Sequence, residues 1–160
     1  MSKKLRHDLT YDAAMVDVAA MLADPKFREE VCEEQHVLRA LVSVDADEDG
    51  MEVTIDQVQA AAGVPSFAKK FVGDEINIVQ TETWVSATEG QIRMTIPGKP
   101  GEMKGSTRLS ESGGVTTHSV DLDILVGIPL VGGKIEGLIS DLLLKALKVQ
   151  NRVGRDYLSR

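Results

Sequence analysis

The chain has 160 residues, of which 42% are hydrophobic and 27% charged, a balance typical of a soluble globular protein with one core. Its formal net charge of −7 argues against nucleic acid as a principal partner, because phosphate binding requires a basic surface. The single cysteine, Cys32, excludes an intramolecular disulfide and a thiolate metal site within one chain.

The N-terminal residues and the lengths of the apolar runs bear on the expected location of the protein. Residues 1–6 are rich in lysine and arginine, but no apolar segment follows them, so we do not expect a secretory signal. No apolar run approaches the ~20 residues that a membrane-spanning helix requires. We therefore expect a cytoplasmic protein without membrane insertion, folded as a single domain over residues 1–160.

The N-terminal third predicts one strand and two short helices. Apolar and polar residues alternate over residues 5–11, which indicates a strand. Asp12 is expected to cap the first helix, and Asp24 the second, with Pro25 at its first position. The apolar face of the first helix consists of Met15, Val18, Ala19 and Leu22.

Six further strands follow, each separated from the next by a turn or a short connecting segment that contains glycine. A run of strands, rather than alternating strands and helices, favours an antiparallel α+β sheet. The strands are expected at residues 37–44, 51–58, 76–85, 91–96, 103–109 and 115–126.

The last quarter of the chain predicts one long helix lying on this sheet. Pro129 ends the final strand, and Gly132 and Gly133 permit a tight reversal. A sheet of about seven strands must curl strongly to bury one face under a single helix. The apolar stripe of that helix consists of Ile135, Ile139, Leu142, Ala146, Val149, Val153 and Tyr157.

This order of elements resembles the helix-grip fold of the START and Bet v 1-like (SRPBCC) superfamily. Several segments also resemble a mainly actinobacterial family, domain of unknown function 2505. They are HDLTYDA at 7–13, DPKFREEVC at 24–32, VPSFAKKFVGD at 64–74, QTETW at 80–84, IPGKP at 96–100 and IPLVGGKIE at 128–136. The superfamily resemblance implies a hydrophobic ligand cavity between the sheet and the C-terminal helix. The narrower family implies no established activity.

Candidate cavity residues come from the helix stripe and from the expected inner faces of the strands. One face of strand 76–85 begins apolar and ends in Gln80, Glu82 and Trp84, so Gln80 would be a polar anchor and Trp84 a wall. Phe67 and Phe71, one helical turn apart, would form either a gate or part of the core. The full candidate set is Ile78, Gln80, Trp84, Met94, Ile96, Phe67, Phe71, Ile135, Leu138, Ile139, Leu142 and Ala146.

Catalytic and metal-binding signals are weak. Glu82 and His118 are the only candidates for a cavity acid or base. For Glu82 we favour a solvated position at the sheet edge, paired with lysine or arginine, because burial of an unpaired charge is costly. No metal or other cofactor is expected, because the histidines lack ligand spacing. Asp121 and Asp123 share one strand face and are expected on its wet side.

The leading functional hypothesis is a non-catalytic carrier or sensor of a hydrophobic small molecule or lipid. One alternative is a cyclase- or isomerase-type enzyme acting on a hydrophobic, polyketide-like substrate, which would need Glu82 or His118. Another is a protein-interaction module whose cavity has collapsed. Sequence periodicity alone does not distinguish packed core residues from pocket residues on the final helix.

Overall fold

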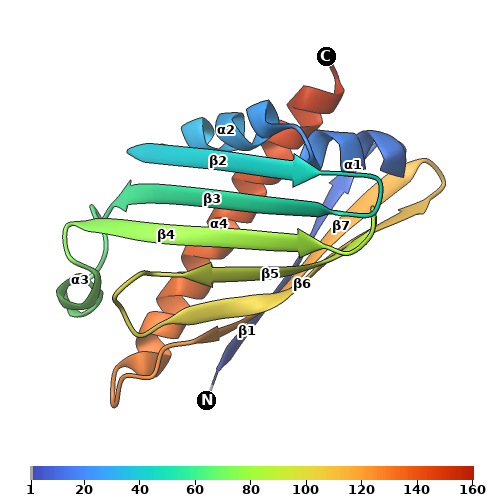
Figure 1. The fold of residues 1–160 in the computed structure, drawn as a ribbon. Helices are drawn as coiled ribbons and strands as arrows, with labels where there is room; N and C mark the ends of the chain where they lie inside the picture. The colour runs from blue at the N-terminus through green and yellow to red at the C-terminus, as the bar shows by residue number, and fades with distance from the viewer. Residues whose placement is uncertain (1) are drawn as a thin grey trace.

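Seven antiparallel strands curve around one long C-terminal helix in the computed structural model, which describes residues 2–160 (Figure 1). The sheet order is β1-β7-β6-β5-β4-β3-β2, so β1 and β2 form its two edges. This arrangement confirms the predicted α+β architecture. The strands are β1 (Lys3–Tyr11), β2 (Arg39–Ala46), β3 (Met51–Ala60), β4 (Glu75–Trp84), β5 (Glu89–Thr95), β6 (Glu102–Ser112) and β7 (Val115–Leu125).

Strand β7 shows how the alternating sequence sets the two faces of the sheet. Its residues Val120, Leu122 and Ile124 are buried against the core. Asp121 and Asp123 point the other way, and Asp123 forms a 3.2 Å ion pair with a lysine on β1. The prediction that these two aspartates lie on the wet face is confirmed.

Two short helices, α1 (Met15–Leu22) and α2 (Pro25–Glu34), carry the chain from edge strand β1 to edge strand β2. Asp24 caps α2 as predicted, because its Oδ1 accepts a 2.9 Å hydrogen bond from the amide of Lys26. The prediction that Asp12 caps α1 is wrong. The helix begins at Met15, whose amide donates instead to the carboxylate of Glu111 on β6, at 2.6 Å.

The start of the long helix α4 (Gly132–Leu158) is fastened to the end of the sheet. A Cβ on Gly132 would lie 2.4 Å from the carbonyl oxygen of Val126, so this close approach requires glycine. The buried carboxylate of Glu136 accepts a 2.8 Å hydrogen bond from the amide of Val126. The predicted hinge therefore brings α4 directly back onto the sheet.

Helix α3 (Ser66–Val72) connects β3 to β4 and lies at the end of the sheet where α4 begins (Figure 1). Its residue Ala68 is buried in a small apolar cluster with Val126 and Ile135. The short helix predicted within residues 64–74 is thus confirmed. It forms one side of the space that the sheet and α4 enclose.

The core is concentrated at the two ends of α4 and is incomplete in the middle. Ile135 and Val153, towards opposite ends of the helix, are 2% and 3% exposed. Leu142, between them on the same predicted stripe, is 45% exposed. The main core joins α1, α2 and the C-terminal half of α4 to β1, β6 and β7. The unfilled region around Leu142 is where the candidate site lies.

Candidate functional site

A cavity of about 590 Å³ lies between the middle of α4 and the concave face of the sheet. We call it the outer chamber. Its walls are mainly apolar, while Glu34, His36, Lys145 and Arg152 contribute polar and charged groups. The apolar lining consists of Ala60, Ala62, Val64, Ala68, Val72, Ile76, Ile78, Ile96, Met103, Ile135, Leu138, Ile139, Leu142, Leu143, Ala146 and Val149.

A smaller space of about 70 Å³, the inner chamber, continues from the outer chamber towards the centre of the sheet. Five residues line both spaces: Gln35, Gln59, Ile78, Leu143 and Ala146. Eight of the sixteen residues that line the inner chamber are polar or charged. Its polar lining consists of Gln35, Gln57, Gln59, Gln80, Glu82, Thr107, His118 and Gln150.

Glu82 is the centre of a buried hydrogen-bond network. Arg28, on α2, donates to its two carboxylate oxygens at 2.8 and 3.0 Å. Gln80 Nε2 donates to Oε2 at 2.6 Å, and Trp84 Nε1 donates to Oε1 at 2.8 Å. Each oxygen therefore accepts two hydrogen bonds, which fills the acceptor positions of an ionised carboxylate. A third Arg28 donor, Nε, bonds the carbonyl of Leu22 at 2.9 Å.

This network keeps Glu82 ionised. Burial alone would raise the pKa of Glu82, but the charge and hydrogen bonds of Arg28, together with the Trp84 hydrogen bond, lower it to about 2. The ion pair is geometrically complete, as a buried pair must be to offset the cost of removing two charges from water. Glu82 consequently offers no free acceptor to a molecule in the inner chamber.

His118 has unused hydrogen-bonding capacity beside this network. Its Nε2 lies 2.5 Å from Thr107 Oγ1, whereas Nδ1 has no hydrogen-bond partner among residues 2–160. Burial lowers the pKa of His118 to about 4; Glu82 opposes this shift and Arg28 adds to it. The imidazole is therefore neutral at neutral pH. Whichever tautomer it adopts, Nδ1 is left to donate or to accept one hydrogen bond.

The structure brings together nine of the twelve predicted cavity residues. Trp84, Phe67 and Phe71 do not line either chamber. Trp84 is a buried core residue that donates a hydrogen bond to Glu82, Phe67 is 37% exposed, and Phe71 packs beside the cluster around Ala68. The nine that line the chambers are Ile78, Gln80, Met94, Ile96, Ile135, Leu138, Ile139, Leu142 and Ala146.

The prediction of a solvated Glu82 at the sheet edge is wrong. β4 lies between β3 and β5, and Glu82 is only 4% exposed. Its expected pairing with a basic residue does occur, but the partner, Arg28, is buried as well. The cost of burying the charge is offset by that partner and by the Gln80 and Trp84 donors.

Sequence reasoning missed most of the polar lining of the inner chamber. One usable signal was the alternation in β3, which places Gln57 and Gln59 on the same face as the buried Val53 and Ile55. Another was Arg28, which lies three and four residues before the buried Val31 and Cys32 on α2.

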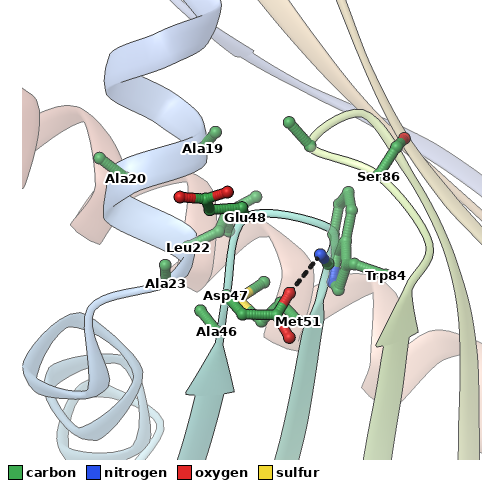
Figure 2. A pocket seen from close by; sticks show the side chains of 12 residues that line it. Ala19, Ala20, Leu22, Ala23, Ala46, Asp47, Glu48, Met51, Trp84 and Ser86 are labelled. Atoms are coloured by element: carbon green, nitrogen blue, oxygen red, sulfur yellow. Dashed lines mark hydrogen bonds between the residues drawn. The ribbon is translucent and has the colours of Figure 1, made fainter.

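A separate hollow of about 230 Å³ lies on the outside of the molecule, between α1 and the turns that follow β2 and β4 (Figure 2). The C-terminal half of α1 contributes alanines and Leu22 to it, and the Trp84 indole forms another part of its wall. Asp47 shapes the β2–β3 turn by accepting a 2.9 Å hydrogen bond from the amide of Gly50. The Trp84 indole thus lines this hollow, and its Nε1 also donates a hydrogen bond to the buried Glu82.

Residues 2–160 contain neither a cluster of metal ligands nor a membrane-spanning helix. No group of three or more histidine, cysteine, aspartate or glutamate side chains is arranged to hold a metal ion. No helix in this range has the length and apolar character needed to cross a membrane.

The chain matches a family model over almost its whole length. The model, described as a protein of unknown function (DUF2505), covers residues 6–158. An uncharacterized protein of Mycobacterium tuberculosis is 29% identical over 119 residues, which represent 69% of this chain and 68% of that protein.

Solved structures with the same fold include TTHA0849 from Thermus thermophilus and norcoclaurine synthase from Thalictrum flavum. The first has a TM-score of 0.67 at 15% identity and covers 96% of this chain and 95% of its own. The second has a TM-score of 0.67 at 13% identity and covers 100% of this chain and 88% of its own. At these identities the similarity concerns the fold alone, and it confirms the predicted helix-grip architecture.

Proposed function

This chain belongs to the DUF2505 family of proteins of unknown function, and we propose that it binds a hydrophobic small molecule or lipid in the outer chamber without converting it chemically. The observation that carries the proposal is the apolar lining of that chamber at the point where the apolar stripe of α4 is least buried. A volume of about 590 Å³ lies within the range of roughly 300–1,000 Å³ typical of small-molecule sites.

The exposure of Leu142 supports the same conclusion. A leucine contributes stability by leaving water, yet Leu142 lies on the stripe that faces the sheet and remains 45% exposed. An apolar ligand in the outer chamber would cover Leu142 and its neighbours Ile139 and Ala146. The open chamber also gives no support to the alternative of an interaction module with a collapsed cavity.

Binding without catalysis is favoured by the state of Glu82. A general acid or base must be free to exchange a proton with its substrate, whereas both carboxylate oxygens of Glu82 already accept two hydrogen bonds each. Its low pKa makes it a weak base as well.

A cyclase- or isomerase-type enzyme is the second candidate, favoured by one observation. The unpartnered Nδ1 of His118 lies in the lining of the inner chamber, where it could exchange a proton with a substrate. If a hydrophobic substrate is turned over, His118→Ala should abolish the activity while the apolar body of the substrate still binds in the outer chamber. Turnover that survives this substitution would exclude His118 as the acid or base.

A fluorescence titration with the neutral apolar dye N-phenyl-1-naphthylamine tests the binding proposal. Ala146 lines both chambers, so Ala146→Phe should fill their junction and weaken dye binding about tenfold or more. Lys148→Phe places the same side chain at an exposed position of α4 and should bind the dye like the unmodified protein. The absence of saturable binding, or equal binding by Ala146→Phe, would contradict the proposal.

A further inference from the structure

The inner chamber contains charged groups but no unbalanced charge. Glu82 is its one ionised lining residue, and the Arg28 guanidinium balances it through two hydrogen bonds. His118, the other titratable group of the lining, is neutral at neutral pH. A charged group entering this buried space would therefore lose its hydration without meeting a free counter-ion, which is strongly unfavourable.

Neutral hydrogen-bonding groups, in contrast, are abundant there. Five glutamines line the chamber, and each amide offers both donors and an acceptor. Gln80 uses one N–H for Glu82, Gln35 donates to the carbonyl of Ala146 at 3.1 Å, and Gln59 donates to Gln57 at 3.2 Å. These bonds fix the direction of the side chains and leave further donor and acceptor positions of the same amides available.

His118 provides independent evidence that a polar atom of the chamber lacks a hydrogen-bond partner. The side chain is 4% exposed, and its Nδ1 has no hydrogen-bond partner among the described residues. A buried polar atom of this kind costs free energy until a ligand or a water satisfies it. At about 70 Å³, the space accommodates a few waters or one small polar group, but not the body of a ligand.

We infer that the ligand is amphipathic and neutral, with its apolar body in the outer chamber and an uncharged hydrogen-bonding head group, such as an amide or hydroxyl, in the inner chamber. The inference rests on the proposed binding function. The glutamine amides and His118 Nδ1 would bond the head group, and the chambers join at Gln35, Gln59, Ile78, Leu143 and Ala146. Anionic and cationic molecules with the same apolar chain would be discriminated against.

Displacement of N-phenyl-1-naphthylamine by three ligands of equal chain length tests this inference. Decanamide should displace the dye at neutral pH at a concentration about tenfold lower than decanoate or decylammonium. Equal displacement by all three would overturn the head-group inference and leave the binding function standing. Displacement by none of them, while the dye itself binds, would overturn the head-group inference alone, whereas a dye that does not bind would overturn both. Preference for either charged ligand would overturn the head-group inference alone.

Substitution of one glutamine tests whether the inner chamber is the source of the preference for the neutral head group. Gln80→Leu should remove most of the advantage of decanamide while the dye binds as before. Gln91→Leu, the same change at an exposed position of β5, should preserve the advantage. Gln57→Leu provides a second test if Gln80→Leu fails to fold, which thermal unfolding followed by circular dichroism reports. An undiminished advantage in a folded Gln80→Leu or Gln57→Leu variant would overturn the assignment of the head group to this chamber.

Discussion

Arg28 and Glu82, separated by 54 residues in the chain, meet in the interior through two hydrogen bonds of 2.8 and 3.0 Å. They are 3% and 4% exposed. The pair connects α2 to the centre of the sheet and holds Gln80 through the same carboxylate. The polar end of the cavity is therefore anchored by a bond between two elements far apart in sequence.

Breaking this pair should strongly destabilise the protein. Glu82→Gln leaves the Arg28 charge buried without a counter-ion, and the free energy of unfolding should fall by about 3–5 kcal/mol in urea denaturation. Glu75→Gln provides the control, because the Arg39–Glu75 pair is exposed and should contribute no more than about 1 kcal/mol. Combining Glu82→Leu with Arg28→Met should cost less than the sum of the two single changes. Equal losses in the Glu82→Gln and Glu75→Gln variants would contradict the role assigned to the buried pair.

His118 should make stability depend on pH. Its pKa is about 4 in the folded protein, compared with an ordinary value of 6.5. Between these values the unfolded chain binds more protons at this site, so stability should fall as the pH is lowered from 6.5 through 4, by at most about 3 kcal/mol. Above this range the histidine should contribute no pH dependence.

Urea denaturation over a series of pH values measures this effect. His118→Gln should show a shallower loss of stability between pH 6.5 and 4 than the unmodified protein. His36→Gln, at an exposed position, should keep the original profile. If the two variants have the same slope, the buried neutral imidazole does not account for the pH dependence.

Ile135 and Leu142, both on the α4 stripe, should respond very differently to truncation to alanine. Ile135→Ala removes a fully packed side chain and should lower the free energy of unfolding by about 2–5 kcal/mol. Leu142→Ala should lower it by less than about 1 kcal/mol, because the side chain is already 45% exposed in the outer chamber. Denaturant unfolding in the absence of ligand makes the comparison. A loss at Leu142 as large as that at Ile135 would show that this region of α4 is packed core.

Glycine substitutions in α4 should have opposite signs at two positions. A Cβ on Gly154 would lie 2.6 Å from the Tyr11 ring, so Gly154→Ala should destabilise by about 1–3 kcal/mol. Apart from its chain neighbours and the nearby backbone of its own helix, a Cβ on Gly137 would meet no heavy atom within 4 Å. Gly137→Ala should therefore stabilise by about 0.5–1 kcal/mol. The difference in melting temperature between the variants measures both effects. Stabilisation by Gly154→Ala would contradict the close packing of α4 on β1.

The architecture could be predicted from sequence because its signals are local and repeated. Alternation along β7 and the Asp24-Pro25 start of α2 depend on neighbouring residues, and both were interpreted correctly. The start of α1 was not, because its acceptor is Glu111 on β6 rather than Asp12. Such a contact between distant segments leaves no periodic trace in the sequence.

The same distinction explains the outcome at the candidate site. The apolar wall of the outer chamber follows from the helix stripe, and Gln80 follows from the inward face of β4. Whether Glu82 is buried depends on Arg28, and no local pattern connects the two. The alternation in β4 correctly predicts that Glu82 lies on the inward face. The cost of burying an unpaired charge nevertheless favoured a solvated position, because the sequence does not reveal that Arg28 is its partner. The cytoplasmic location expected from the sequence stays a prediction.

Methyl-resolved NMR during titration with decanamide tests the central claim most directly, because it shows where the ligand lies. The account predicts saturable chemical-shift changes at the methyl groups of Ile78, Ile139 and Leu142, which line the outer chamber. The methyl groups of Leu5, in the closed core, and of Leu41, exposed on edge strand β2, should change little. No saturable change, or changes centred on Leu41 and other apolar residues outside the chambers, would contradict a ligand site between the sheet and α4.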